Sequence, residues 1–129
     1  MPGWTDLILN PEGIRALYPD PPSLDDVTIH EWRLDRDGPT VIARFDLTDL
    51  PARMPEKWAR LGHNRVQLEM AFVSVSDLAV RGIASTMTGP LTVTRDGARI
   101  VVGFRSPEAS VDLVCEFVHV RGISAHTVL

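Results

Sequence analysis

Apolar and polar residues alternate along two pairs of segments, and a strong turn signal joins the members of each pair. An Asp-Gly dipeptide stands at positions 37–38 and another at 96–97. After each dipeptide, apolar side chains recur at every other position, within residues 41–47 and 100–104. A period of two is typical of a strand with one buried face, and Asp-Gly between two such runs is typical of a β-hairpin. The pattern predicts two antiparallel hairpins.

The chain also contains one apolar phrase twice. Residues 66–75 (VQLEMAFVSV) match residues 111–120 (VDLVCEFVHV) at a constant offset, with Arg-Asp-Gly before and Val-Arg-Gly-Ile after both copies. Buried strands share a small vocabulary, so one match alone could be coincidence. The ordered series favours two similar halves of four strands. We therefore predict a mainly β fold, with about eight antiparallel strands forming a sandwich or a strongly curled sheet from two pseudo-repeated halves.

One short helix is predicted near the N-terminus, over residues 10–18. Asn10 is a good N-cap and Pro11 suits the first helical position. Ile14 and Leu17 follow at helical spacing, and a run of prolines ends the helix. Because a helix of about two turns is unstable alone, we expect it to lie on the sheet.

Length and composition restrict the class of protein. The 129 residues fit one β-rich domain over residues 1–129, and contents of 44% hydrophobic and 23% charged residues are ordinary for a globular protein. The net charge of −4 argues against a nucleic-acid partner, and no run approaches the ~20 apolar residues of a membrane span. The N-terminus lacks the features of a signal peptide, and a single cysteine allows no disulfide framework. A cytoplasmic setting is therefore expected.

Known catalytic and metal-binding patterns do not occur in the sequence. His30 and Trp32 should share one strand face with Glu31 opposite, so His30 and Glu31 cannot bind one metal without a bulge. Cys115 is expected to be a small buried core residue. The chain has no G-x-S-x-G, P-loop or dinucleotide-binding pattern. We predict a protein that is not an enzyme and needs no cofactor and no metal.

The connection over residues 48–64 contains the main candidate binding surface, which is the loop over residues 51–64. Residues 106–110 fill the matching place in the second half, and so long a loop in a compact β domain usually has a function. Trp58 either plugs an open end of the sandwich or anchors a partner, and Trp32 poses the same choice. The candidate partner-binding residues are Trp58, Arg53, Glu56, Arg60, His63, Asp49, Trp32 and Asp35. The acidic members of this set would meet basic groups of a partner.

The chain resembles the immunity protein 50 family of bacterial polymorphic toxin systems. The resemblance rests on NPEGIRALYPDPPSLDDVTIHE, on the strand pair around RDGPTVIARFDLTDLP, on PEKW and LGHNRVQLEM, and on the later VRGI. It implies a small cytosolic protein that binds a co-produced toxin and blocks it by occlusion. It assigns no binding residue.

Two other functions stay open. A curled sheet could enclose a pocket for a small ligand, closed by the Trp58 loop. Alternatively, the chain could be a subunit of a structural homo-oligomer that pairs through an edge strand. The sequence leaves the oligomeric state and the identity of the toxin open.

Overall fold

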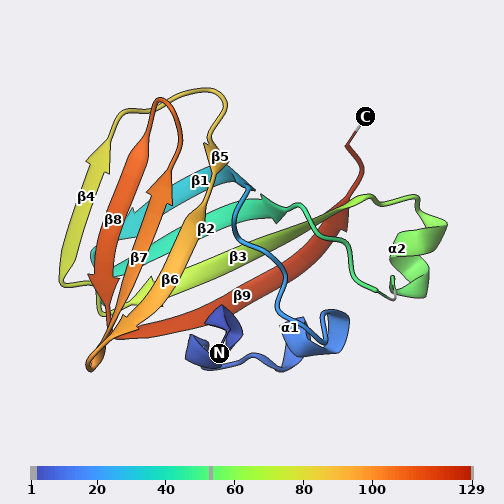
Figure 1. The fold of residues 1–129 in the computed structure, drawn as a ribbon, viewed down its shortest axis with the longest axis horizontal. Helices are drawn as coiled ribbons and strands as arrows, with labels where there is room; N and C mark the ends of the chain where they lie inside the picture. Colours follow the sequence, from blue (N-terminus) through green and yellow to red (C-terminus); the bar gives the residue numbers. More distant parts are fainter. Residues whose placement is uncertain (1–2, 53, 129) are drawn as a thin grey trace.

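Two antiparallel β-sheets face each other in the computed structural model, which describes residues 3–52 and 54–128 (Figure 1). The strands are β1 (Val27–Asp35), β2 (Thr40–Leu47), β3 (Arg65–Val73), β4 (Asp77–Arg81), β5 (Thr88–Gly89), β6 (Leu91–Asp96), β7 (Arg99–Arg105), β8 (Ser110–Cys115) and β9 (Phe117–His126). A 3-10 turn (Trp4–Leu7) and the helices α1 (Glu12–Leu17) and α2 (Glu56–Arg60) complete the described elements. The described strands form sheets of order β5-β1-β2-β3-β9 and β4-β8-β7-β6, which do not close into a barrel. The predicted mainly β sandwich is confirmed.

The two predicted halves are visible in the topology. Strands β1, β2 and β3 are successive neighbours in one sheet, as β6, β7 and β8 are in the other. The strand that follows each set crosses to the opposite sheet, so β4 pairs with β8 and β9 pairs with β3. The halves thus exchange their fourth strands, and Val-Arg-Gly-Ile recurs at the end of β4 and within β9.

The repeated apolar phrase does not occupy equivalent structure in its two copies. Residues 66–73 lie within β3, and the chain turns only after them. The second copy turns earlier, at Glu116, so residues 117–120 already belong to β9 in the other sheet. Phe72 is therefore fully buried, whereas its counterpart Phe117 is 44% exposed.

Both predicted hairpins are present. In the first, Asp35 pairs with Thr40, and in the second, Asp96 pairs with Arg99. Each turn contains a glycine with a positive φ, a conformation that a residue without Cβ adopts easily. In the second turn this glycine is Gly97, with φ at 63°. The Asp-Gly signals therefore placed the turns correctly.

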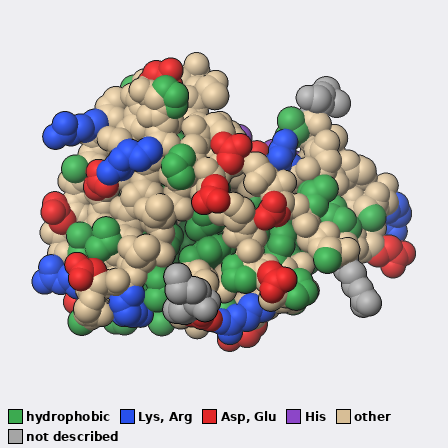
Figure 2. All heavy atoms as spheres, viewed as in Figure 1, with side chains coloured by type: hydrophobic (Ala, Val, Ile, Leu, Met, Phe, Trp, Pro, Cys, Tyr) green, Lys and Arg blue, Asp and Glu red, His purple; other side chains and the backbone are tan. Residues whose placement is uncertain are grey.

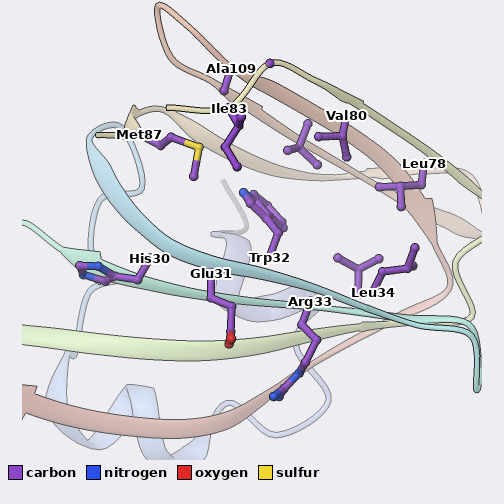
Figure 3. A pocket seen from close by; sticks show the side chains of 13 residues that line it. His30, Glu31, Trp32, Arg33, Leu34, Leu78, Val80, Ile83, Met87 and Ala109 are labelled. Atoms are coloured by element: carbon purple, nitrogen blue, oxygen red, sulfur yellow. The ribbon is translucent and has the colours of Figure 1, made fainter. Parts of the chain in front are cut away.

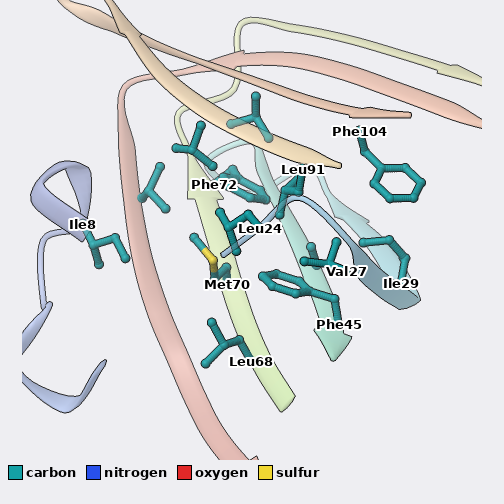
Figure 4. Close-up of a cluster of buried hydrophobic side chains, with 14 of the residues drawn as sticks. Ile8, Leu24, Val27, Ile29, Phe45, Leu68, Met70, Phe72, Leu91 and Phe104 are labelled. Carbon is teal, nitrogen blue, oxygen red and sulfur yellow. The ribbon is translucent and has the colours of Figure 1, made fainter. Parts of the chain in front are cut away.

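The core lies between the inner faces of the sheets (Figure 4). Phe45, Phe72 and Phe104 are each 0% exposed and come from both sheets. Full burial of one such side chain stabilises the fold by about 1.5–3 kcal/mol. Cys115 is also buried in this core, as predicted, and burial raises the pKa of its thiol to about 11.

The N-terminal segment closes the fold along β9. The predicted helix is present as α1, and its Ile14 is 1% exposed. Asn10 does not cap this helix, so that prediction is wrong: its Nδ2 donates to Val120 O and its Oδ1 accepts from Val120 N, both at 2.8 Å. The free edge of β9 offers a backbone donor and acceptor together, and this pair of bonds replaces the single bond of a local cap.

A β-bulge in β1 changes which side chains face the interior. The register of β1 against β2 shifts at His30, so that Trp32 lies opposite the buried Ala43 and Glu31 opposite Arg44. Trp32 faces the space between the sheets, whereas His30 and Glu31 both belong to the outer face of the five-stranded sheet. The prediction that His30 and Trp32 share a face is therefore wrong, because one extra residue reverses the alternation.

Candidate binding surfaces

An apolar cleft of about 450 Å³ opens between the two sheets, where β1 faces β4 (Figure 3). We refer to it as the β1–β4 cleft. Its walls come from β1, from β4 and from the segment that joins β4 to β5, and the buried Val41 and Val111 lie at its base. The larger apolar side chains in its walls are Trp32, Leu34, Leu78, Val80, Ile83 and Met87.

Several of these side chains are exposed to solvent. Ile83 is 86% exposed, Leu34 65% and Val80 59%. Isolated exposed apolar residues are normal on a protein surface, but a group of them around one cleft is typical of a binding site. The cleft can hold an apolar ligand or an apolar part of another protein.

Trp32 is the largest side chain of the cleft. Its ring lies 6.2 Å from the ring of Phe104, centroid to centroid, and the two planes are tilted by 57°. Its Nε1 is buried and has no hydrogen-bond partner among residues 3–52 and 54–128. A buried donor without an acceptor is rare in folded proteins, so an ordered water or a bound molecule is expected to accept from it.

A buried carboxylate organises the outer face of the five-stranded sheet. Asp46 is 6% exposed. Its Oδ2 lies 2.9 Å from His30 Nε2, and its Oδ1 accepts from His126 Nε2 at 2.9 Å and from Gln67 Nε2 at 3.1 Å. The two imidazole rings are 6.3 Å apart and nearly perpendicular. The carboxylate thus fixes side chains from three other strands in one polar cluster.

The charge of Asp46 is maintained by these contacts. Burial alone raises the pKa of the carboxyl group, but the hydrogen bonds from His30, Gln67 and His126 outweigh it, and the net pKa is lowered. A polar hollow of about 360 Å³ lies beside the cluster, with Asp26, Thr28 and Arg65 in its walls. Within the described residues, no group of three or more metal-ligating side chains is placed to hold a metal ion.

The predicted loop surface lies around α2. Trp58 is partly buried and packs against the hydrophobic core, whereas Glu56 and Arg60 are exposed. His63 Nδ1 lies 3.2 Å from Thr127 Oγ1. Arg53, which the sequence also indicated, lies outside the described residues. Trp58 therefore makes a structural contact with the core, and part of its side chain stays accessible to solvent.

The two predicted acidic residues outside α2 make local bonds. Asp49 is exposed, and its Oδ2 accepts from Ser23 N at 2.8 Å while its backbone oxygen accepts from Tyr18 Oη at 2.7 Å. Burial, and then the Asp49 carboxylate, raises the pKa of Tyr18 well above its ordinary value. Asp35 lies in the first hairpin and its Oδ1 accepts from Asp37 N at 2.9 Å. Asp49 thus ties the α2 loop to the N-terminal segment.

The predicted binding residues fall into two groups at opposite ends of the sandwich. Figure 1 shows α2 at one end and β4 at the other. Trp32 and Asp35 of β1 belong to the β4 end, since Trp32 lines the β1–β4 cleft together with Leu78 and Val80. The α2 residues line no part of that cleft.

Sequence reasoning left a pocket open as an alternative but did not place the cleft, and it missed the Asp46 cluster. The exposed apolar residues Val80 and Ile83 belong to the repeated Val-Arg-Gly-Ile, which was used only as a marker of the repeat. Two apolar residues, Val80 and Ile83, on either side of Arg81-Gly82 at the end of a strand were the available signal. Asp46 gave none, because its partners His30 and His126 are far apart in the chain.

Charged side chains of both signs lie on the visible face of the molecule. On the face shown in Figure 2, acidic and basic side chains are interspersed and form no large patch of one sign. None of the described helices is both long and apolar enough to cross a membrane.

Two facing sheets, an open apolar cleft and a polar sheet face define a small β-sandwich with surfaces suited to binding. The family model described as Immunity protein 50 matches residues 10–126, nearly the whole chain. The chain therefore belongs to the Immunity protein 50 family. Searches among curated proteins and among solved structures found no match.

Proposed function

We propose that this protein neutralises a cognate toxin of a bacterial polymorphic toxin system by binding and occluding it in the cytoplasm. The observation that carries the proposal is the family match over residues 10–126. An immunity family implies a toxin as the partner and, in general, binding rather than catalysis.

The fold supports inhibition by occlusion. The core between the sheets joins residues from both, and side-chain bonds such as those of Asp46 fix part of the surface before a partner arrives. A surface that is already ordered loses little conformational entropy on binding, so more of the contact energy contributes to affinity. Such a protein needs only to cover the toxin's working surface.

The loop around α2 is part of this proposal as a candidate contact. Glu56 and Arg60 are exposed, and Trp58 is only partly buried. Trp and Arg are enriched among residues that dominate binding energy. Replacement of Trp58 by Ala in a folded variant tests the loop, because unchanged toxin affinity would remove it from the interface.

A co-expression assay tests the proposed function. The probe is the C-terminal domain of a large secreted protein encoded next to this chain, expressed in the cytoplasm of a host that it kills. We expect the wild-type chain to restore growth and to co-purify with that domain in a stoichiometric complex. An unrelated immunity protein is the control. Failure of the chain to relieve toxicity would reject the proposal.

A small apolar ligand is a second candidate partner, and the cleft is the observation that favours it. Its volume of about 450 Å³ falls within the range of small-molecule sites. The predicted closure of such a pocket by the Trp58 loop is not seen, since α2 lines no part of it. Titration with palmitate, followed by thermal shift and native mass spectrometry, distinguishes this function from toxin binding.

A further inference from the structure

The edges of the five-stranded sheet are covered unequally. Along β9, Leu9 N donates to Val118 O at 2.9 Å and Asn10 binds the backbone of Val120. Along β1, the short strand β5 pairs only with Val27 and Thr28. The N-terminal segment thus protects one edge, whereas the other is covered over little more than its first residues.

The remainder of the β1 edge has no strand beside it in the described chain. Beyond the bond from Ile29 N to Met87 O (2.8 Å), residues 31–35 of β1 pair with β2 on one side only. A free edge presents unpaired backbone donors and acceptors, which recruit another strand unless they are blocked. This stretch of β1 is also the wall of the β1–β4 cleft.

Glu31 and Arg33, the charged residues on either side of Trp32, are already paired within the chain. Arg44 Nε lies 3.8 Å from Glu31 Oε1, and Arg33 Nη2 lies 3.4 Å from Glu69 Oε1. Glu31 and Arg33 point away from the cleft, whereas Trp32 extends into it toward Ile83 and Met87 (Figure 3). Charge complementarity therefore calls for a neutral, apolar occupant.

An occupant that excludes water from the cleft must supply the hydrogen-bond acceptors that water would otherwise provide. The buried Nε1 of Trp32 has no acceptor within the described residues. The free backbone edge of β1 has no partner strand there either. A hydrocarbon chain would fill the cleft but leave these groups unsatisfied, which is costly for a buried donor. An extended polypeptide supplies both apolar side chains and carbonyl oxygens.

We infer that the partner adds an extended, uncharged segment to residues 31–35 of β1, with an apolar side chain in the β1–β4 cleft and an acceptor on Trp32 Nε1. The inference rests on the proposed function and takes the toxin as the source of the segment. The added strand continues the line of β5 along the β1 edge. Exposed Leu34, Val80 and Ile83 become buried against its side chains.

Matched aspartate variants test the cleft contact with the purified toxin domain from the rescue assay. Leu34→Asp and Ile83→Asp place a charge in the apolar cleft at sites that are 65% and 86% exposed, so the fold tolerates them. We expect each to weaken toxin binding at least about tenfold. Leu9→Asp is the control, because Leu9 is equally exposed at 64% but lies along β9; its Kd should stay within about threefold of wild type.

Two spectroscopic measurements test the strand pairing and the indole bond. Hydrogen–deuterium exchange should show slower amide exchange within residues 31–35 when the toxin is bound. In a ¹⁵N-¹H spectrum the indole resonance of Trp32 should move downfield, whereas that of Trp4, which already donates to Pro22 O at 2.9 Å, should not. The third indole, of Trp58, reports on the α2 loop in the same spectrum.

The outcomes separate this inference from the proposed function. Unchanged affinity of Leu34→Asp and Ile83→Asp, with rescue by the wild-type chain, overturns the inference and leaves toxin neutralisation standing. A shift confined to the Trp58 indole, with unchanged exchange in β1, overturns it in favour of the α2 loop. Palmitate binding or self-association that Leu34→Asp abolishes, without any change in toxin affinity, assigns the cleft to another occupant. No rescue by wild type rejects both proposals.

Discussion

Replacement of Asp46 by Asn should destabilise the protein, because Asp46 is the acceptor at the centre of a four-residue cluster. Its two oxygens accept hydrogen bonds from His30, Gln67 and His126 at 2.9–3.1 Å. Asn keeps one acceptor oxygen but turns the other into an amide donor. That donor faces an imidazole nitrogen, so the ring must change tautomer or the bond is lost, and in either case the negative charge is removed.

The magnitude follows from the number of bonds and their exposure. Loss of one partner of a buried, charged hydrogen bond costs about 1–3 kcal/mol. The side chains of His30 and His126 are 34% and 38% exposed, so water replaces part of what they lose, and the cost falls in the lower part of that range. We expect Asp46→Asn to lower the free energy of unfolding by about 1–2 kcal/mol.

The effect should depend on pH in a defined direction. The pKa of Asp46 in the folded protein is below its ordinary value of 3.8. The contribution of the carboxylate is therefore complete above pH 3.8 and is lost as the pH falls through the lower, folded value. The difference in the free energy of unfolding between wild type and Asp46→Asn should therefore narrow as the pH falls below 3.8.

Urea denaturation followed by tryptophan fluorescence measures the difference, at about pH 6 and again at about pH 3. With a slope m of about 2 kcal/mol/M, the expected loss moves the midpoint by about 0.5–1 M. Asp112→Asn is the control, since Asp112 pairs with Arg105 at 2.7 Å but is 52% exposed; it should cost less than about 1 kcal/mol. Equal stability of wild type and Asp46→Asn, or an equal difference at both pH values, would refute this account.

Three further predictions concern separate parts of the chain. Gly82→Ala should destabilise the folded protein by about 2 kcal/mol or more, because Gly82 has φ +74° and an added Cβ would collide with the backbone oxygen of Glu108. Gly62→Ala, at φ +71° but in open space, should cost about 1 kcal/mol. Thermal denaturation of both variants measures the difference. The thiol of Cys115, with its pKa raised to about 11, should react with DTNB at neutral pH only as fast as the protein unfolds, and immediate modification would contradict its burial. Trp58→Ala should lower the urea midpoint measurably because Trp58 packs on the core, and an unchanged midpoint would show that its contacts contribute no stability.

Local sequence patterns predicted much of the fold. The period-two alternation predicted strands with one buried face, and the Asp-Gly dipeptides at 37–38 and 96–97 placed two hairpins. These signals depend on residues close in sequence, because backbone geometry alternates side chains and Gly permits positive φ. The ordered repeats also indicated two similar halves, although not that their fourth strands are exchanged.

Choices of residue type were less informative about position. Trp32 was selected as a candidate because tryptophan is common at interfaces, and the structure places it in an apolar cleft that no pattern had indicated. The candidate α2 residues lie at the opposite end of the sandwich. Residue type can indicate a candidate binding residue, but it does not predict which other side chains will surround that residue.

The sequence by itself determined where strands and turns form and to which family the chain belongs. Only the tertiary structure decided which side chains meet. The bulge at His30 reversed the alternation of side chains in β1. Asn10 binds the backbone at the edge of β9 instead of capping the helix, and Asp46 accepts hydrogen bonds from three other strands. Each of these outcomes depends on pairing between segments distant in the chain. Such pairing is fixed by the joint burial of apolar faces and the satisfaction of polar groups, which no local pattern encodes.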